Sequence, residues 1–189
     1  MTTSAALAAA VDEMTRVLSP HVDADWTVPA GSLEWSCVQT AAHIGHDLTA
    51  YAMQLATLAD DAYLPLDLEV RDGTAPAQVL RIVRGCGRLL GLAIDAAAPG
   101  ARAWHWGPAD VTGFAAMGMN ETLIHTWDIA QGLGLAWEPP PEAARTILGR
   151  LFPAAAADDP VDALLRCTGR RGEGGTDWTV TAALGPDSP

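Results

Sequence analysis

The chain has 189 residues, enough for one domain with a small appendage, and 49% of them are hydrophobic, enough for a substantial core. Its formal net charge is −12, and all 11 basic residues are arginine. Such an acidic surface repels phosphate groups, so the composition argues against nucleic acids and anionic membranes as partners. Neither a signal peptide nor an apolar run of about 18 residues is recognisable, which predicts a cytoplasmic protein.

The cysteine pattern agrees with that location. Cys37, Cys86 and Cys167 are widely spaced and belong to no C-x-x-C motif. They are therefore expected to be free thiols, not disulfides or zinc ligands. Cys37 begins a predicted helix, where the dipole lowers a thiol pKa. No base is placed beside it, so we expect it to be a small core residue.

Hydrophobic periodicity predicts four long helices and a shorter fifth. In chain order, we expect them at Ser4–Leu18, Ser36–Leu58, Ala75–Ala97, Thr112–Gly132 and Pro139–Phe152. The fold class is thus all-α, a four-helix bundle with an extra short helix. The polar segment between the second and third helices is long for a helix pair, so a crossover fits the pattern as well as up-and-down packing does.

Local signals set several boundaries. Ser36 and Gln39 form the S-x-x-Q pattern of a capping box, which starts the second helix. Thr74 is the expected N-cap of the third helix, with Pro76 in its first turn. Residues 99–108 are expected to form a loop or a short extended piece.

We expect residues 1–152 to form the bundle and residues 153–189 a small appendage packed on it. Within the appendage, the pattern predicts a short helix at Val161–Leu165. It also predicts a β-hairpin in which Arg166–Arg171 pairs with Trp178–Ala182 across a turn at Gly172–Gly175.

A candidate metal site is the most informative feature of the sequence. In the helix MGMNETLIHTWDIAQG, Glu121 and His125 lie four residues apart on one face. His43 lies on another long helix that must face the same core. Two histidines, one carboxylate and an open position make a common catalytic zinc arrangement. The alternative is a structural Glu–His hydrogen bond with a core histidine beside it.

Neighbouring polar residues have candidate supporting roles. Asp128 lies one turn after His125 and is expected to orient it as a hydrogen-bond acceptor, or else to be a solvated aspartate. His46, with its neighbour Asp47, competes with His43 as a ligand. Asn120 is expected to line the same cavity or to be a polar boundary residue.

The motifs resemble those of a known family. Trp35 and His43 match W-x7-H, Glu121 and His125 match E-x3-H, and His125–Ala130 match H-x-W-D-[LI]-A. In this order they resemble the DinB-like superfamily, and within it the N-terminal domain group of mycothiol-dependent maleylpyruvate isomerases. The resemblance covers about Ser4 to Phe152.

The resemblance implies a four-helix bundle that binds a divalent metal, often zinc or nickel, through His43, Glu121 and His125. Characterised members use low-molecular-weight thiols such as mycothiol, as thiol S-transferases or as an isomerase. The full isomerase carries a larger C-terminal domain than residues 153–189 provide. Maleylpyruvate isomerase activity itself is therefore not implied.

The expected function is attack by a metal-bound thiolate or water on an electrophilic small molecule, by transfer or isomerisation. His46 and Asp47 are the candidate catalytic pair for moving a proton. Arginines of the third helix are expected either to hold an anionic group of the substrate or to form a solvated face; they are Arg81, Arg84 and Arg88.

Two other functions remain open. The first is a non-catalytic carrier, sensor or immunity protein that binds a metal or a small ligand in a pocket lined by Trp104, His105, Trp106 and Trp127. The second is a hydrolase or cyclase that uses zinc-bound hydroxide without a thiol. A homodimer is compatible with each of these functions.

Overall fold

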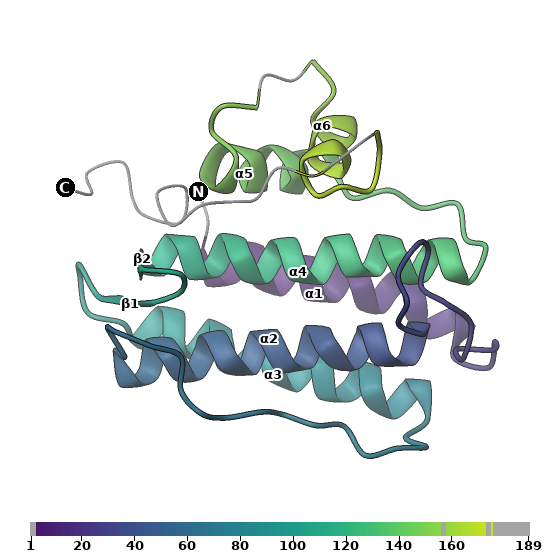
Figure 1. Ribbon diagram of the computed structural model, residues 1–189, viewed down its shortest axis with the longest axis horizontal. Helices are drawn as coiled ribbons and strands as arrows, with labels where there is room; N and C mark the ends of the chain where they lie inside the picture. The colour runs from purple at the N-terminus through teal and green to yellow at the C-terminus, as the bar shows by residue number, and fades with distance from the viewer. Residues whose placement is uncertain (1–2, 156–157, 173–174, 176–189) are drawn as a thin grey trace.

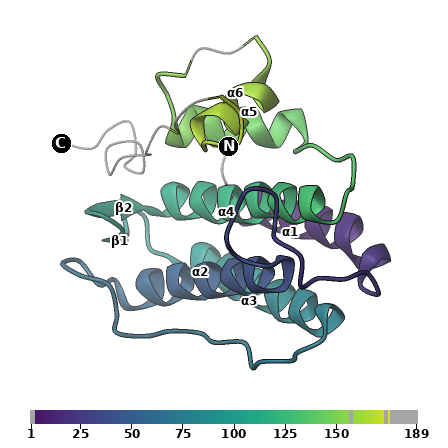
Figure 2. The ribbon, with the colours of Figure 1, turned by 45° about the vertical axis from the view of Figure 1, so that its right-hand side comes forward.

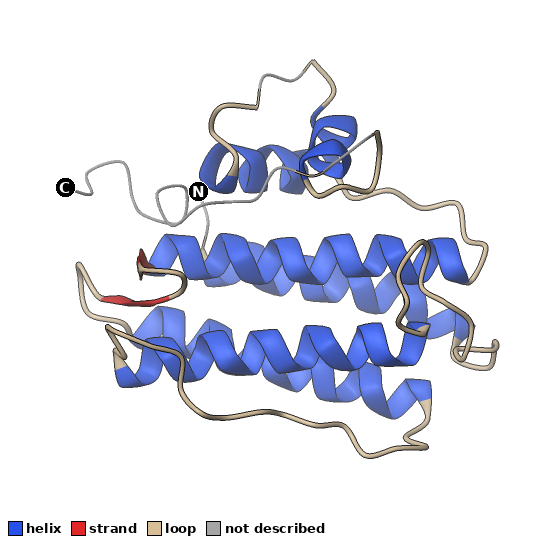
Figure 3. Ribbon diagram, in the orientation of Figure 1, coloured by secondary structure: helices blue, strands red, loops and turns tan. Residues whose placement is uncertain are grey.

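The computed structural model describes residues 3–155, 158–172 and 175. Four long helices form its body in two layers (Figures 1 and 3), which confirms the predicted all-α bundle. One layer holds α1 (Ser4–Leu18) and α4 (Val111–Gly132), and the other holds α2 (Cys37–Thr57) and α3 (Pro76–Ala96). Helices α1 and α2 each pack against both α3 and α4. A 3-10 turn, η1 (Ser19–His21), follows α1.

The bundle contains a crossover. Helices α2 and α3 run in the same direction, because the segment between them returns along the outside of the bundle from one end to the other (Figure 1). The length of this polar connection therefore reflects the distance it has to cover. It also places residues 58–75 alongside α2, where they form one wall of a cavity described below.

Helix boundaries follow the local chemistry in most places. The capping box of α2 is confirmed. The backbone amide of Gln39 donates to Ser36 Oγ, and the backbone amide of Ser36 donates to Gln39 Oε1. The prediction of Thr74 as the cap of α3 is wrong. Pro76 occupies the first helical position, which makes Ala75 the cap residue. The Thr74 hydroxyl instead donates to the carbonyl of Arg71.

A small hairpin closes one end of the bundle. Its strands, β1 (Arg102–Trp104) and β2 (Pro108–Asp110), pair antiparallel within the segment predicted to contain a short extended piece. The hairpin is held against the end of α2, since the Trp104 amide donates to the Ala59 carbonyl over 2.6 Å. Trp106 lies at its tip with a φ of 59° and is 74% exposed.

Two further helices lie on the outer side of α4. Helix α5 (Pro141–Leu151) packs on α4, and α6 (Pro160–Cys167) packs on α5 (Figure 2). The prediction of a strand at Arg166–Arg171 is wrong, because α6 extends to Cys167 and is followed by a turn. Asp159 caps the helix, since its side chain accepts from the Val161 backbone amide. The partner strand predicted at Trp178–Ala182 lies outside the described residues.

The core is closely packed where all four long helices meet. Gly118 of α4 lies there, and a Cβ atom at this position would come within 2.8 Å of Leu90, 3.1 Å of Leu48 and 3.1 Å of Leu7. These leucines belong to α3, α2 and α1, respectively. The glycine thus permits the close approach that brings α2 and α4 together. In the part of the chain that is described, no helix is long and apolar enough to cross a bilayer.

Candidate metal centre

Facing positions of α2 and α4 bring the three predicted ligands together. His43 comes from α2, and Glu121 and His125 come from successive turns of α4. One ligand atom of each residue lies within 4.8 Å of the other two. The His43 and His125 rings are 5.1 Å apart between centroids and meet edge to face. Helical spacing and the packing of α2 on α4 therefore produce a two-histidine, one-carboxylate group.

Glu121 and His125 form a buried pair. His125 Nε2 lies 3.2 Å from Glu121 Oε2, and both side chains are mostly buried. Burial opposes ionisation of Glu121, but the hydrogen bond from His125 and the nearby positive charges outweigh it and lower the carboxyl pKa. Burial likewise opposes protonation of His125, but hydrogen bonds to Asp128 and Glu121 raise its pKa to about 9. The Glu121–His125 pair is thus arranged to stabilise a positive charge that lies between His125 Nε2 and Glu121 Oε2.

Asp128 holds the other side of the His125 ring. Its Oδ2 lies 2.9 Å from His125 Nδ1, as expected for an orienting carboxylate. Because a carboxylate only accepts, Nδ1 must carry the proton, and Nε2 points to Glu121. Asp128 is almost fully buried, and Arg170 binds it through two hydrogen bonds of 2.7 and 3.1 Å. Burial raises the Asp128 pKa, but the hydrogen bonds from His125 and Arg170 lower it by a larger amount. The net shift of the pKa is therefore downward.

His43 and His46 share one carboxylate. Asp47 Oδ2 lies 3.1 Å from His43 Nε2, and Asp47 Oδ1 lies 4.0 Å from His46 Nε2. Burial raises the pKa of Asp47 despite the hydrogen bond from His43. His46 Nδ1 accepts from the Leu68 amide over 3.3 Å, so this histidine faces the crossover segment. Trp35 packs on His43 with ring centroids 4.7 Å apart, which limits the ring's movement.

The group opens into a cavity of about 460 Å³. Helices α2 and α4 provide its floor, including His43, Asp47 and Glu121. The crossover segment and the hairpin provide its walls. His105, on the hairpin, packs against Tyr51, Tyr63 and Phe114, and burial lowers its pKa to about 4. The imidazole of His105 is therefore neutral at physiological pH.

Several residues considered for this site do not line the cavity. Trp104 and Trp127 are not among its lining residues, in contrast to His105 and Trp106. Asn120 is buried beside Glu121 and does not line it either. Its Oδ1 has no hydrogen-bond partner among the described residues.

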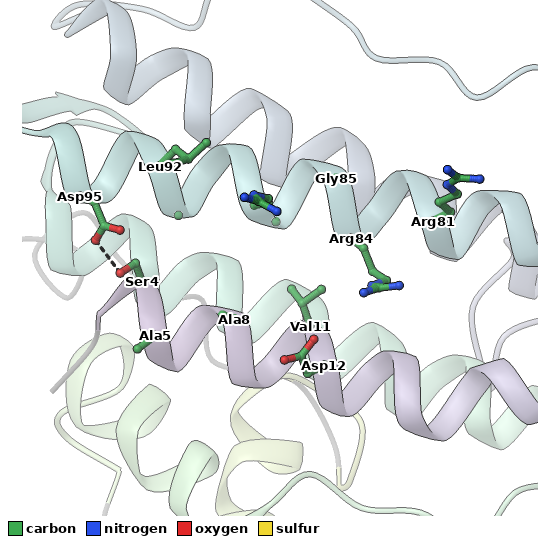
Figure 4. A pocket seen from close by; sticks show the side chains of 13 residues that line it. Ser4, Ala5, Ala8, Val11, Asp12, Arg81, Arg84, Gly85, Leu92 and Asp95 are labelled. Carbon is green, nitrogen blue, oxygen red and sulfur yellow. Dashed lines mark hydrogen bonds between the residues drawn. The ribbon is translucent and has the colours of Figure 1, made fainter.

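The arginines of α3 lie elsewhere. Arg81, Arg84 and Arg88 line a separate hollow of about 540 Å³ between α1 and α3 (Figure 4). Arg84 extends toward α1 near Asp12, whereas Arg81 points away from it. The prediction that these arginines hold a substrate beside His43 and Glu121 therefore finds no support, and the alternative of an exposed basic face agrees with the structure.

The cysteines also lie outside the cavity. Cys37 and Cys86 are buried, and burial raises the thiol pKa of Cys37 to about 11 and that of Cys86 above its usual value. Cys37 therefore packs in the core as expected, and burial outweighs the helix dipole at this position.

The donor set fits a divalent metal. Zinc bonds of about 2.0–2.2 Å in a tetrahedron place ligand atoms roughly 3.3–3.5 Å apart. The Glu121–His125 pair already has a spacing of 3.2 Å. The ligand atom of His43 lies within 4.8 Å of the other two, so an adjustment of at most about 1.5 Å completes the set. Oriented imidazoles and a carboxylate suit zinc or nickel better than magnesium, which prefers oxygen ligands.

Fold and site together define an all-α four-helix bundle with a two-histidine, one-carboxylate group that is suited to a divalent metal. Residues 7–130 match the family described as the mycothiol maleylpyruvate isomerase N-terminal domain. The match covers more than half of the chain, and the chain belongs to this family. No curated protein and no solved structure matches it significantly.

Sequence reasoning missed one residue of the site. Arg170 follows the family region, yet it pairs with Asp128 next to His125. A buried aspartate implies a positively charged partner, but 11 arginines gave no basis for choosing among them.

Proposed function

We propose that this protein is a divalent-metal-dependent enzyme that activates a low-molecular-weight thiol, of the mycothiol type, for reaction with an electrophilic small molecule. The observation that carries the proposal is the convergence of His43, Glu121 and His125, two of which, His43 and Glu121, line the floor of an open cavity. A divalent ion bound there would lower the pKa of a coordinated thiol or water, so that thiolate or hydroxide is available near neutral pH.

The surrounding residues have separate tasks in this proposal. Asp128 fixes the tautomer and orientation of His125, and Arg170 fixes Asp128. Asp47 lies between His43 and His46, where it can accept the thiol proton and pass it to His46. The pair His46 and Asp47 is thus the proposed route by which the proton leaves the site.

The burial of the protein's own thiols supports an external thiol. Cys37 and Cys86 are buried, Cys167 is on α6, and none of the three lines the cavity. Burial raises the pKa of all three thiols, which leaves little thiolate at neutral pH. Sulfur chemistry at this site therefore requires a cosubstrate.

Metal content is the first test. Protein purified without a His-tag is analysed by mass spectrometry as wild type, His43→Ala, His125→Ala and the control His21→Ala, whose histidine does not line the cavity. We expect about one zinc or nickel per chain in the wild type and the control, and loss in the other two variants. Wild-type protein that takes up no metal, even with added zinc or nickel, refutes the proposal.

The thiol is tested next. The metal-loaded protein is incubated with 1-chloro-2,4-dinitrobenzene and with mycothiol, glutathione, cysteine or no thiol. A C–S bond forms as chloride leaves, and the product absorbs light. We expect turnover with at least one thiol and none in the His125→Ala variant. Turnover of hydrolysable esters without thiol would favour a hydrolase, and ligand binding without any turnover would favour a carrier or sensor.

A further inference from the structure

The cavity next to His43 and Glu121 has an uneven charge distribution. Its lining includes three carboxylates, those of Asp47, Asp67 and Glu121. Throughout the described residues, no lysine or arginine side chain lines it, and the arginines of α3 lie in the other hollow. A bound divalent ion would offset two of these negative charges. Apart from that ion, the described lining offers no lysine or arginine to pair with a substrate that carries two carboxylates.

The walls of the cavity are apolar and exposed. Met53 of α2, Tyr63 and Leu66 of the crossover segment and Trp106 of the hairpin all line it. They are exposed by 39%, 49%, 45% and 74%, respectively. Large apolar side chains that converge, while exposed, on one cavity are a feature of ligand-binding sites. A flat apolar group entering the cavity would cover them.

One buried side chain holds these walls together. Gln54 is 2% exposed, and its Nε2 donates to the carbonyls of Ala62 and Trp104 over 3.1 and 2.9 Å. Its Oε1 accepts from the Leu64 amide over 3.0 Å. A single amide thus joins the backbone beside Tyr63 to the strand that leads to Trp106. The backbone that carries the aromatic walls is therefore held in place before a ligand arrives, which reduces the entropy cost of binding.

We propose that the electrophile accepted at this site is an uncharged molecule with an aromatic or similarly flat apolar group, and not a dicarboxylate. The inference rests on the proposed metal function and adds the substrate class. In the bound state, the reacting atom lies toward His43 and Glu121, and the apolar group lies between Tyr63, Leu66 and Trp106. The electrophilic carbon then faces the thiolate, while the acidic lining disfavours substrates that carry carboxylates.

Hydroxamic acids test this inference because they share one metal-binding group and differ in the attached group. Acetohydroxamate, benzohydroxamate, and 3- and 4-carboxybenzohydroxamate are titrated into zinc-loaded protein at pH 7 by calorimetry. We expect benzohydroxamate to bind at least tenfold more tightly than acetohydroxamate. We expect the two carboxylated forms to bind at least fivefold more weakly than benzohydroxamate.

A matched pair of variants tests whether Trp106 contacts the phenyl group. Trp106→Ala should remove most of the advantage of the phenyl group and leave the affinity for acetohydroxamate unchanged. Leu89→Ala removes an exposed leucine of α3 that does not line the cavity, and it should behave as wild type. The zinc content of each variant is measured in parallel.

The outcomes separate the two proposals. If the carboxylated compounds bind as tightly as benzohydroxamate, or if the phenyl group adds no affinity, the substrate class is wrong while the metal function stands. If zinc-loaded protein binds none of the four compounds, including acetohydroxamate, the metal lacks an open position. That result would overturn the proposed function and the inference with it.

Discussion

Arg170 binds Asp128 with both ends of its guanidinium group, Nη2 to Oδ2 at 2.7 Å and Nε to Oδ1 at 3.1 Å. The pair joins the turn after α6 to the helix that carries His125. Residues beyond the family region therefore take part in holding the candidate metal centre.

Replacing Arg170 should weaken both the fold and the site. Arg170→Gln leaves the carboxylate of Asp128 buried without its arginine partner, so we expect a loss of about 2–4 kcal/mol in the free energy of unfolding, measured in urea. Zinc affinity should fall roughly 10-fold, because Asp128 orients His125 less firmly. The control Arg171→Gln loses bonds to Glu138 and Asp162, both partly exposed, and should cost under about 1 kcal/mol. Equal effects in the two variants would show that Arg170 has no special role.

Metal binding should stabilise the native state. At free zinc about 100 times its dissociation constant, we expect the free energy of unfolding to rise by about 2.7 kcal/mol. Glu121→Gln keeps the size of the side chain but removes the ligand charge, so zinc should add much less stability. The measurement is urea unfolding with and without zinc, followed by a chelator to reverse the gain. A zinc effect that is equal in both proteins would place the metal elsewhere.

His105 should make the protein sensitive to mild acid. Its pKa is about 4 in the native state, where burial is the main cause of the shift, and about 6.5 in an unfolded chain. Between these values the unfolded state binds more protons, so stability falls as pH falls from about 6.5 to 4, by on the order of 1–3 kcal/mol. His105→Gln should show a shallower pH dependence in unfolding experiments, and His21→Gln should match the wild type. A slope that is unchanged in His105→Gln would contradict the assignment.

Packing at the helix crossing gives a prediction that does not involve the metal. Gly118→Ala would place a methyl group 2.8 Å from Leu90 and 3.1 Å from Leu48, and should destabilise by about 1–3 kcal/mol. Gly85→Ala is the matched control, since a Cβ atom there meets nothing within 4 Å. That change should be neutral or stabilise by up to about 1 kcal/mol, because alanine favours the helix. Thermal unfolding compares the stabilities of the two variants. If they are equally stable, the leucines around Gly118 can move to accept the added methyl group.

Much of this architecture was predictable because it depends on local patterns. Apolar periodicity located the long helices, and the Ser36–Gln39 pair located the start of α2. The four-residue spacing of Glu121 and His125 put both on one face. The need for α2 to pack inward indicated His43 but left His46 as a competitor, and the W-x7-H resemblance favoured His43. These features lie within single helices, where residue spacing translates directly into direction.

Features that depend on distant segments were not predictable in the same way. The crossover segment has no periodicity, so nothing indicated that Tyr63 and Leu66 would border the site. The Asp128–Arg170 pair spans 42 residues and depends on how α5 and α6 pack on α4. The error at Arg166–Arg171 arose because short segments carry similar signals for strand and helix, and the cap at Asp159 was overlooked.

The parallel course of α2 and α3 has a consequence for how this protein can diversify. The ligand candidates lie on α2 and α4, whereas much of the cavity wall comes from residues 58–75 and from the hairpin. Connecting segments tolerate sequence change far better than packed helices do. In the proposed function, chemistry and selectivity are thus encoded in different parts of the chain. New specificities can arise by exchanging the crossover segment while the reactive centre stays intact.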